Sequence, residues 1–106
     1  MTIIMTVSFQ LQADKRDEAI AAALAMQAET TLEPGCSEYR FWIAADDPDA
    51  LGLFERWDTQ EALDEHLATA HMATFGQAIT TVLDQQATLT RYEVASSTRY
   101  SGSDDA

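Results

Sequence analysis

Hydrophobic and polar residues alternate along the first segment of the chain. Between residues 3 and 11 an apolar side chain occupies every odd position, and mostly polar side chains lie between them. A period of two is typical of a β-strand with one buried face. Ile4 interrupts the alternation, which predicts that the second face of this strand is not fully exposed to water.

A helical pattern follows this strand. We expect a helix from about Lys15 to about Thr31, with Asp14 as its N-cap. The sequence E-P-G at residues 33–35 ends it, because proline cannot continue a helix and glycine accepts the turn. The apolar positions predicted to face the core recur at helical spacing and are Ile20, Ala23, Leu24, Ala28 and Leu32.

Two further strands are predicted at residues 36–45 and 50–58, separated by a D-D-P-D turn at residues 46–49. Their alternation assigns one set of side chains to the core, namely Tyr39, Phe41, Ile43, Leu51, Leu53, Glu55 and Trp57. Trp42 and Phe54 fall on the opposite face. Large apolar residues on an outer face need a covering surface.

The second helical region changes phase part of the way along. The D-x-x-E sequence of Asp58 and Glu61 predicts a capping box that begins a helix, with Leu63 and Leu67 on its buried side. Near Thr69 the apolar stripe shifts, and the new stripe consists of Met72, Phe75, Ile79, Val82 and Leu83. This shift predicts two helices joined by a bend, or one kinked helix.

A last strand is predicted at residues 87–95, so the order is strand, helix, strand, strand, helix, strand. That order is typical of an α+β, ferredoxin-like domain, an antiparallel sheet with helices on one face. We expect this domain to occupy residues 1–95 and the polar tail, residues 96–106, to be disordered. The open sheet face would carry Ile4, Trp42 and Phe54, which a second subunit most simply covers, so we expect a homodimer.

Charge narrows the choice of partners. The formal net charge is -12, from 18 acidic and 6 basic residues, and such a surface repels phosphate backbones and anionic lipids. We therefore expect no nucleic-acid partner and no membrane partner. The start of the chain has neither a basic head nor a continuous apolar run, so we expect a cytoplasmic protein. Cys36, the single cysteine, is expected to be a small, partly buried residue.

Several of these segments together resemble one protein family. The sequence E-P-G-C-S-E-Y-R-F at residues 33–41, the stretch L-F-E-R-W-D-T-Q-E-A-L-D-E-H-L-A-T-A-H-M-A-T-F at residues 53–75 and the closing strand are similar to the antibiotic biosynthesis monooxygenase domain family. The resemblance covers about residues 3 to 95. It implies a dimeric α+β barrel with a pocket between sheet and helices. It also implies oxidation of aromatic or quinol substrates by molecular oxygen without metal or flavin.

His66 and His71 are the predicted catalytic residues, because an imidazole titrates near neutral pH and can take a proton from a phenolic hydroxyl. Either could instead pack or cap its helix. On a continuous helix they would lie about 140° apart, so they can share a pocket only if the helix bends between them. The i, i+4 histidine spacing of many metal sites is absent, and we expect neither a metal nor another cofactor. The haem-degrading relatives in this family use an asparagine in their pocket. The sequence contains no asparagine, so the resemblance disfavours haem degradation.

The predicted substrate-binding residues are Trp57, Phe9, Tyr39, Glu55, Phe75 and Arg91. Trp57 could stack on an aromatic substrate or fill the core beneath the second helix. We expect Trp57, His66 and His71 to border one cavity between the sheet and the second helical region, where a quinol binds. Glu55 lies on the same strand face, where it would either pair with a base such as Arg91 or have a raised pKa. Arg91 could instead hold an anionic quinol oxygen.

The function that the resemblance and these residues favour is a cofactor-independent monooxygenase that oxidises a quinol or polyphenolic aromatic with molecular oxygen. An isomerase on the same scaffold and a non-catalytic dimer that binds a small ligand are the alternatives. Oxygen consumption in the presence of quinols and polyphenols separates the first from the other two.

Overall fold

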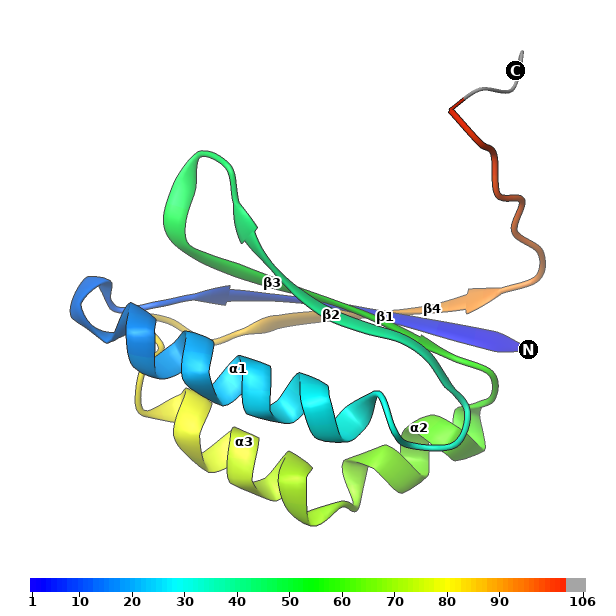
Figure 1. Ribbon diagram of the computed structural model, residues 1–106, viewed down its shortest axis with the longest axis horizontal. Coiled ribbons are helices and arrows are strands. Elements are labelled where there is room, and N and C mark those ends of the chain that lie inside the picture. Colours follow the sequence, from blue (N-terminus) through cyan, green and yellow to red (C-terminus); the bar gives the residue numbers. More distant parts are fainter. Residues whose placement is uncertain (103–106) are drawn as a thin grey trace.

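The sheet is antiparallel in the computed structural model, which describes residues 1–102. Its strands are β1 (Thr2–Gln10), β2 (Cys36–Ala44), β3 (Asp47–Trp57) and β4 (Thr88–Val94), in the spatial order β2-β3-β1-β4. The helices α1 (Arg16–Thr30), α2 (Gln60–Leu67) and α3 (Ala70–Thr80) all cover one face of this sheet (Figure 1). The α+β, ferredoxin-like arrangement predicted from the sequence is confirmed.

The core lies between the sheet and the helices. Along β3 the buried and half-buried positions alternate, and Leu51, Leu53, Glu55 and Trp57 all face the helices, as predicted. The neighbouring strands contribute to the same face because the register pairs Trp57 with Ile3 on β1 and with Cys36 on β2.

The buried side of α1 agrees with the prediction at Ala23 but differs from it at other predicted positions. Leu24 and Leu32 are 60% and 81% exposed, whereas the residues that face the sheet are Ala19, Ala23, Met26 and Thr30. The helix is rich in alanine, so its sides differ little in hydrophobicity and the apolar pattern could not identify the buried one. The predicted N-cap is also wrong: Asp14 lies in a short 3-10 turn, η1 (Ala13–Lys15), and no side chain caps α1.

The bend in the second helical region is confirmed. It separates α2 from α3, and each helix begins with a threonine whose hydroxyl accepts a backbone N–H: Thr59 from Ala62, and Thr69 from Met72. The predicted cap at Asp58 is therefore one residue too early. Leu67, predicted to be buried, is 55% exposed, and its neighbour His66 faces the core instead.

The hairpin between β2 and β3 is tighter than expected. Its turn consists of Ala45 and Asp46, and β3 already begins at Asp47, inside the predicted D-D-P-D turn. A register irregularity between Ile43 and Ala44 accommodates the change. The helix α1 is tied to this end of the sheet by Arg16, whose guanidinium donates to Asp49 at 2.8 and 3.1 Å.

The sheet face opposite the helices carries apolar side chains from all four strands. Trp42 and Tyr92 are 54% and 49% exposed, and Ile4 and Phe54 are half-buried. The guanidinium of Arg40 lies 5.0 Å from the centre of the Trp42 ring. The predicted exposure of this apolar face is confirmed for a single chain.

No helix within residues 1–102 is long and apolar enough to cross a membrane. Residues 96–102 carry neither helix nor strand. The predicted disordered tail extends to residue 106, and its last part, residues 103–106, lies outside the described residues; its disorder stays a prediction.

Candidate functional site

A loop between α1 and β2 carries the first residue of the site, Glu33. Its backbone N–H donates to the carbonyl of Thr30 at 3.0 Å, and its own carbonyl accepts from Cys36 at 3.3 Å. Gly35 has a φ of 81°, a left-handed conformation that glycine adopts without strain. A Cβ at Gly35 would lie 2.6 Å from the Cβ of Ala62, so this loop packs directly against α2.

The bend between α2 and α3 brings the two histidines together. His66 lies in the last turn of α2 and His71 is the second residue of α3. Thr69 joins the two helix ends, because its hydroxyl donates to the carbonyl of His66 at 2.7 Å and caps α3 by accepting from Met72 at 3.2 Å. The ring centres of His66 and His71 are 6.1 Å apart. The prediction that these residues can meet only across a bend is confirmed.

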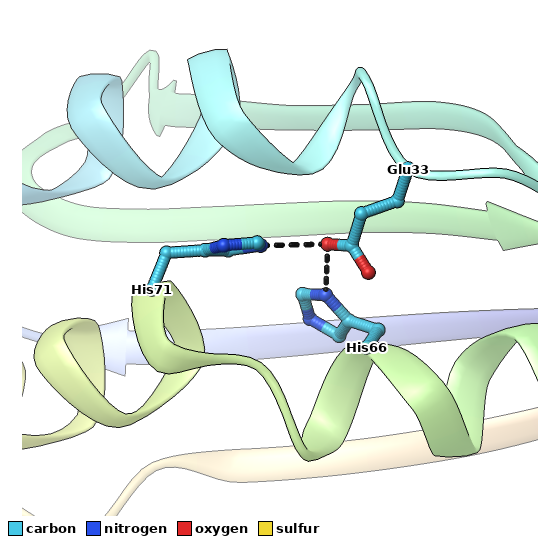
Figure 2. Close-up of side chains that lie close together, drawn as sticks. All are labelled: Glu33, His66 and His71. Carbon is cyan, nitrogen blue, oxygen red and sulfur yellow. Dashed lines mark hydrogen bonds and ion pairs between the residues drawn. The ribbon is translucent and has the colours of Figure 1, made fainter.

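Both histidines contact the same oxygen of Glu33. The Nδ1 of His66 is 2.8 Å and the Nε2 of His71 is 2.7 Å from Oε2, so one carboxylate oxygen bridges two imidazoles from different helices (Figure 2). The side chains of Glu33 and His71 are 14% and 23% exposed, whereas that of His66 is 1% exposed. The bridge therefore extends from the core to the surface.

The bridge assigns the ring protons. A carboxylate only accepts, so each imidazole donates an N–H to it. His66 then carries its proton on Nδ1 and His71 carries its proton on Nε2. Within the described residues no group is hydrogen-bonded to Nδ1 of His71, and in the neutral ring this atom holds a free lone pair.

Beneath His66 the aromatic side chains form a continuous core. Its ring lies 4.8 Å from that of Trp57 and 5.5 Å from that of Tyr39. Phe9 and Phe75 extend this cluster, in edge contact at 6.0 Å. Trp57 is fully buried at 0% exposure. The structure thus brings together Trp57, Phe9, Tyr39, Phe75 and His66, which the sequence analysis selected.

Glu55 is buried in the same region, and the pKa of its carboxyl is raised. Burial raises the pKa of its carboxyl to about 7, the hydrogen bond from Trp57 opposes that increase, and the negative charge of Glu33 adds to it. The Nε1 of Trp57 donates to Oε1 of Glu55 at 3.0 Å. Burial together with these carboxylates also raises the pKa of the Tyr39 hydroxyl, and it raises that of the Cys36 thiol to about 11.

The predicted ion pair between Glu55 and Arg91 is wrong. Arg91 is exposed on β4, where its guanidinium donates to Gln60 at 2.9 Å and to Glu93 at 3.0 Å. Arg91 and Glu55 lie on the same sheet face, since both pair with Met5 of β1. However, β1 separates their strands, and Arg91 reaches the first turn of α2 instead of the core. The other predicted outcome for Glu55, a raised pKa, is confirmed.

A groove runs between α1 and α3 and has a volume of about 530 Å³. His71 and Phe75 line it, whereas Trp57 and His66 are not among its lining residues. The prediction that Trp57, His66 and His71 border one cavity is wrong for this groove, because Trp57 and His66 are buried in the core. The complete lining is Ala22, Ala25, Met26, Glu29, Ala70, His71, Thr74, Phe75 and Ala78. Small alanine side chains on both helices leave the space, and the polar groups are at Glu29, His71 and Thr74.

Glu33 was not predicted as a site residue, although the E-P-G sequence that contains it was predicted to end a helix. A signal was available: carboxylates are unfavourable near the negative end of a helix, and the last turn of α1 carries no basic residue to balance one. In the structure Glu33 is held by His71, in the first turn of α3, where the positive end of that helix favours an anion. Glu33, His66 and His71 are also a set of metal-ligating types, with one donor atom of each within 4.8 Å of the others.

Comparison with known proteins gives consistent matches. The model of the family described as antibiotic biosynthesis monooxygenase matches residues 2–78. An uncharacterized protein of Synechocystis is 27% identical over 93 residues, which are 88% of this chain and 63% of that protein, so the chain spans under two thirds of this relative's length.

Two solved structures are similar over most of the chain. Rv0793 from Mycobacterium tuberculosis is 26% identical, with a TM-score of 0.87 over 93% of this chain and 100% of that one. A protein of unknown function from Bacteroides thetaiotaomicron, described as a possible oxidoreductase, is 27% identical, with a TM-score of 0.82 over 88% and 97% of the two chains.

Proposed function

Because this chain belongs to the antibiotic biosynthesis monooxygenase family, we propose that it oxidises a quinol or polyphenolic aromatic with molecular oxygen and without a cofactor. The observation that carries this proposal is the position of His71. Its Nε2 is hydrogen-bonded to a carboxylate while its ring lines a groove between two helices. A histidine held in this way can accept a proton from a bound hydroxyl.

The groove suits a flat aromatic substrate. Its volume of about 530 Å³ falls within the range of small-molecule sites. Alanine side chains and Met26 provide flat apolar walls, and Phe75 offers a ring against which another ring can pack. Thr74 and Glu29 add hydroxyl and carboxylate oxygens that can hydrogen-bond to substrate hydroxyl groups.

The first step is removal of a substrate proton. Nδ1 of His71 takes the proton from a quinol hydroxyl, and Glu33 stabilises the resulting imidazolium through Nε2. His66 is a positioning residue, because it holds the same carboxylate oxygen from the core side and is itself fixed by Trp57. Tyr39 contacts the ring of His66, Phe9 contacts Phe75, and Glu55 accepts a hydrogen bond from Trp57. Arg91 is hydrogen-bonded to Gln60 of α2 and does not line the groove.

The oxidation then needs only substrate and oxygen. The quinol anion donates electrons to oxygen, a carbon–oxygen bond forms and a ring hydroperoxide results. Loss of the ring C–H proton breaks the oxygen–oxygen bond, which releases one water and leaves a hydroxyquinone. Quinol plus oxygen thus gives hydroxyquinone plus water, so the ring loses four electrons and oxygen gains four. Exclusion of bulk water favours this chemistry over side reactions.

We also propose that the active form is a cytoplasmic homodimer that buries the open sheet face. Trp42 and Tyr92 are half-exposed in the single chain, next to Ile4 and Phe54. Exposure to water of an apolar surface contributed by all four strands is energetically unfavourable. A stable pair would bury about 800 Å² or more on each partner.

An oxygen-consumption screen against quinols and polyphenols tests the proposed activity. Active substrates should yield a product that contains one atom from ¹⁸O₂. With such a substrate, His71→Ala should slow the reaction by about 10²-fold or more, as expected for loss of a positioned base. Glu65→Gln is the matched control, because it changes an exposed carboxylate on α2 that does not line the groove and should retain most activity.

Two results would contradict the proposal. Binding of quinols without any oxygen uptake would identify a non-catalytic binding protein. Conversion of a substrate without uptake of oxygen would identify an isomerase.

A further inference from the structure

We propose that Glu33, His66 and His71 form a binding site for a divalent first-row transition metal, and that a bound metal prevents His71 from acting as a base. This inference goes beyond the proposed oxidation, and the metal-binding part does not depend on it. It rests on the convergence of three donor groups from three separate segments of the chain (Figure 2).

The donor set matches the chemistry of such metals. Imidazole nitrogens bind zinc, copper, nickel and iron, and a carboxylate oxygen often completes the set. Here Oε2 of Glu33 is within 2.8 Å of both Nδ1 of His66 and Nε2 of His71. Three protein ligands leave a fourth position open, as in sites where the metal also holds water or a small ligand.

Only a small rearrangement separates the hydrogen-bonded state from a coordinated one. The donor atoms lie within 4.8 Å of one another. Bonds of about 2.0–2.1 Å in a tetrahedral site place donors roughly 3.3–3.5 Å apart. The most distant pair must therefore approach by about 1.3–1.5 Å, and each histidine nitrogen must move roughly 0.5–0.8 Å away from Oε2 of Glu33. His71 can supply this movement, because it is half-buried in the first turn of α3, next to the bend at Thr69.

The opposite histidine is already fixed. The ring of His66 is 1% exposed and packs against Trp57 at 4.8 Å, so it keeps its orientation when a metal enters. Access is through the outer side of the site, where Glu33 and His71 are 14% and 23% exposed. The net charge of -12 favours the approach of a cation.

Metal binding would reverse the proton assignment of His71. Without metal, Nε2 carries the proton that Glu33 accepts, and Nδ1 holds the free lone pair. A metal on Nε2 displaces that proton, and a neutral imidazole must then carry its proton on Nδ1. The nitrogen available to a substrate becomes a donor and can no longer accept a hydroxyl proton. The same three residues would thus have a metal-free, basic state and a metal-bound, inactive state.

Titration of metal-free, tag-free protein with Zn²⁺ against a chromophoric chelator tests the binding site without any substrate. We expect one Zn²⁺ per chain and no competition by Mg²⁺, which prefers oxygen ligands. Glu33→Gln and His71→Ala should each weaken Zn²⁺ binding by at least the tenfold to roughly 100-fold seen when a supporting group is lost. Glu65→Gln, which removes the same charge from an exposed residue beside His66, should leave binding unchanged.

The folded state of each variant is checked by circular dichroism, and His66→Ala is avoided because that side chain is fully buried. The ¹⁵N shifts of His71 should show protonated Nε2 without metal and protonated Nδ1 with Zn²⁺. No stoichiometric binding, or binding that Glu33→Gln and His71→Ala leave intact, would overturn the metal site. Stoichiometric binding with unchanged ring protonation would overturn the proposed inactivation. None of these measurements uses oxygen consumption. A negative result here would therefore overturn the metal site without affecting the proposed oxidation, and the reverse also holds.

Discussion

The buried carboxyl of Glu55 should make the stability of this protein depend on pH in a direction opposite to that of most carboxylates. Burial raises its pKa from 4.5 to about 7 in the folded chain, so the folded state favours the protonated form. One pKa unit corresponds to about 1.4 kcal/mol, and the separation between these two values therefore corresponds to about 3 kcal/mol of folding free energy.

The sign follows from which state binds the proton. Below pH 4.5 Glu55 is protonated in both the folded and the unfolded chain, and its favourable contribution is complete. Between pH 4.5 and about 7 the unfolded chain releases the proton while the folded chain retains it, so the free energy of unfolding falls as pH rises. Above about 7 the folded chain also ionises and the loss levels off.

Glu55→Gln isolates this contribution. The amide has the shape of the protonated carboxyl and can still accept from Nε1 of Trp57, but it cannot ionise. Urea denaturation at fixed protein concentration, from pH 4 to pH 8.5, should show nearly equal stability at the acidic end. At the alkaline end the variant should be more stable by up to about 3 kcal/mol.

Glu65→Gln is the control, because it neutralises an exposed carboxylate on α2 and should show a flat difference from the unsubstituted protein. A flat difference for Glu55→Gln as well would refute the argument from burial. A difference that favours the unsubstituted protein at high pH would mean that the carboxylate has a favourable partner when ionised.

Four further substitutions test the fold and the proposed dimer interface. Gly35→Ala should lower the free energy of unfolding by about 2 kcal/mol or more, because the positive φ is strained for alanine and the new Cβ would lie 2.6 Å from that of Ala62. Gly76→Ala, within α3 and with open space around it, should raise that free energy by up to about 1 kcal/mol, and urea denaturation measures both. Trp57→Ala should lower it by about 3–5 kcal/mol and shift the NMR signals of His66, whose ring packs against it. Trp42→Glu should convert a sedimenting dimer into a folded monomer, and an unchanged sedimentation coefficient would contradict the proposed interface.

The sheet could be predicted from the sequence because its alternation is strong. From Leu51 to Trp57 in β3 every second residue is a large apolar or aromatic side chain or Glu55, so one slip of register would expose Trp57 to water. The buried face of α1 could not be predicted in this way. Ala19 and Ala23 contribute little hydrophobic contrast, and the close approach of helix and sheet selects their side only in the folded chain.

The site was predictable only in part for a similar physical reason. His66 and His71 were found because histidine is rare here and the phase shift near Thr69 indicated the bend. Glu33 was missed because the charge that it carries is common in this acidic chain, and its role comes from contacts across the fold. Its partners are 33 and 38 residues away in the sequence.

That separation has a consequence for how the protein folds. Each of the two hydrogen bonds of Glu33 closes a long loop of chain, and such contacts form only after the entropy of loop closure has been overcome. Oε2 of Glu33 can meet the two histidine nitrogens only after three segments have packed together. These segments are the loop before β2, the end of α2 and the start of α3. A partly folded chain that has paired its strands but not packed its helices therefore has the aromatic side chains of its strands in place but no site. The backbone amides of this junction should become protected from hydrogen exchange only when the last helix has packed against the sheet.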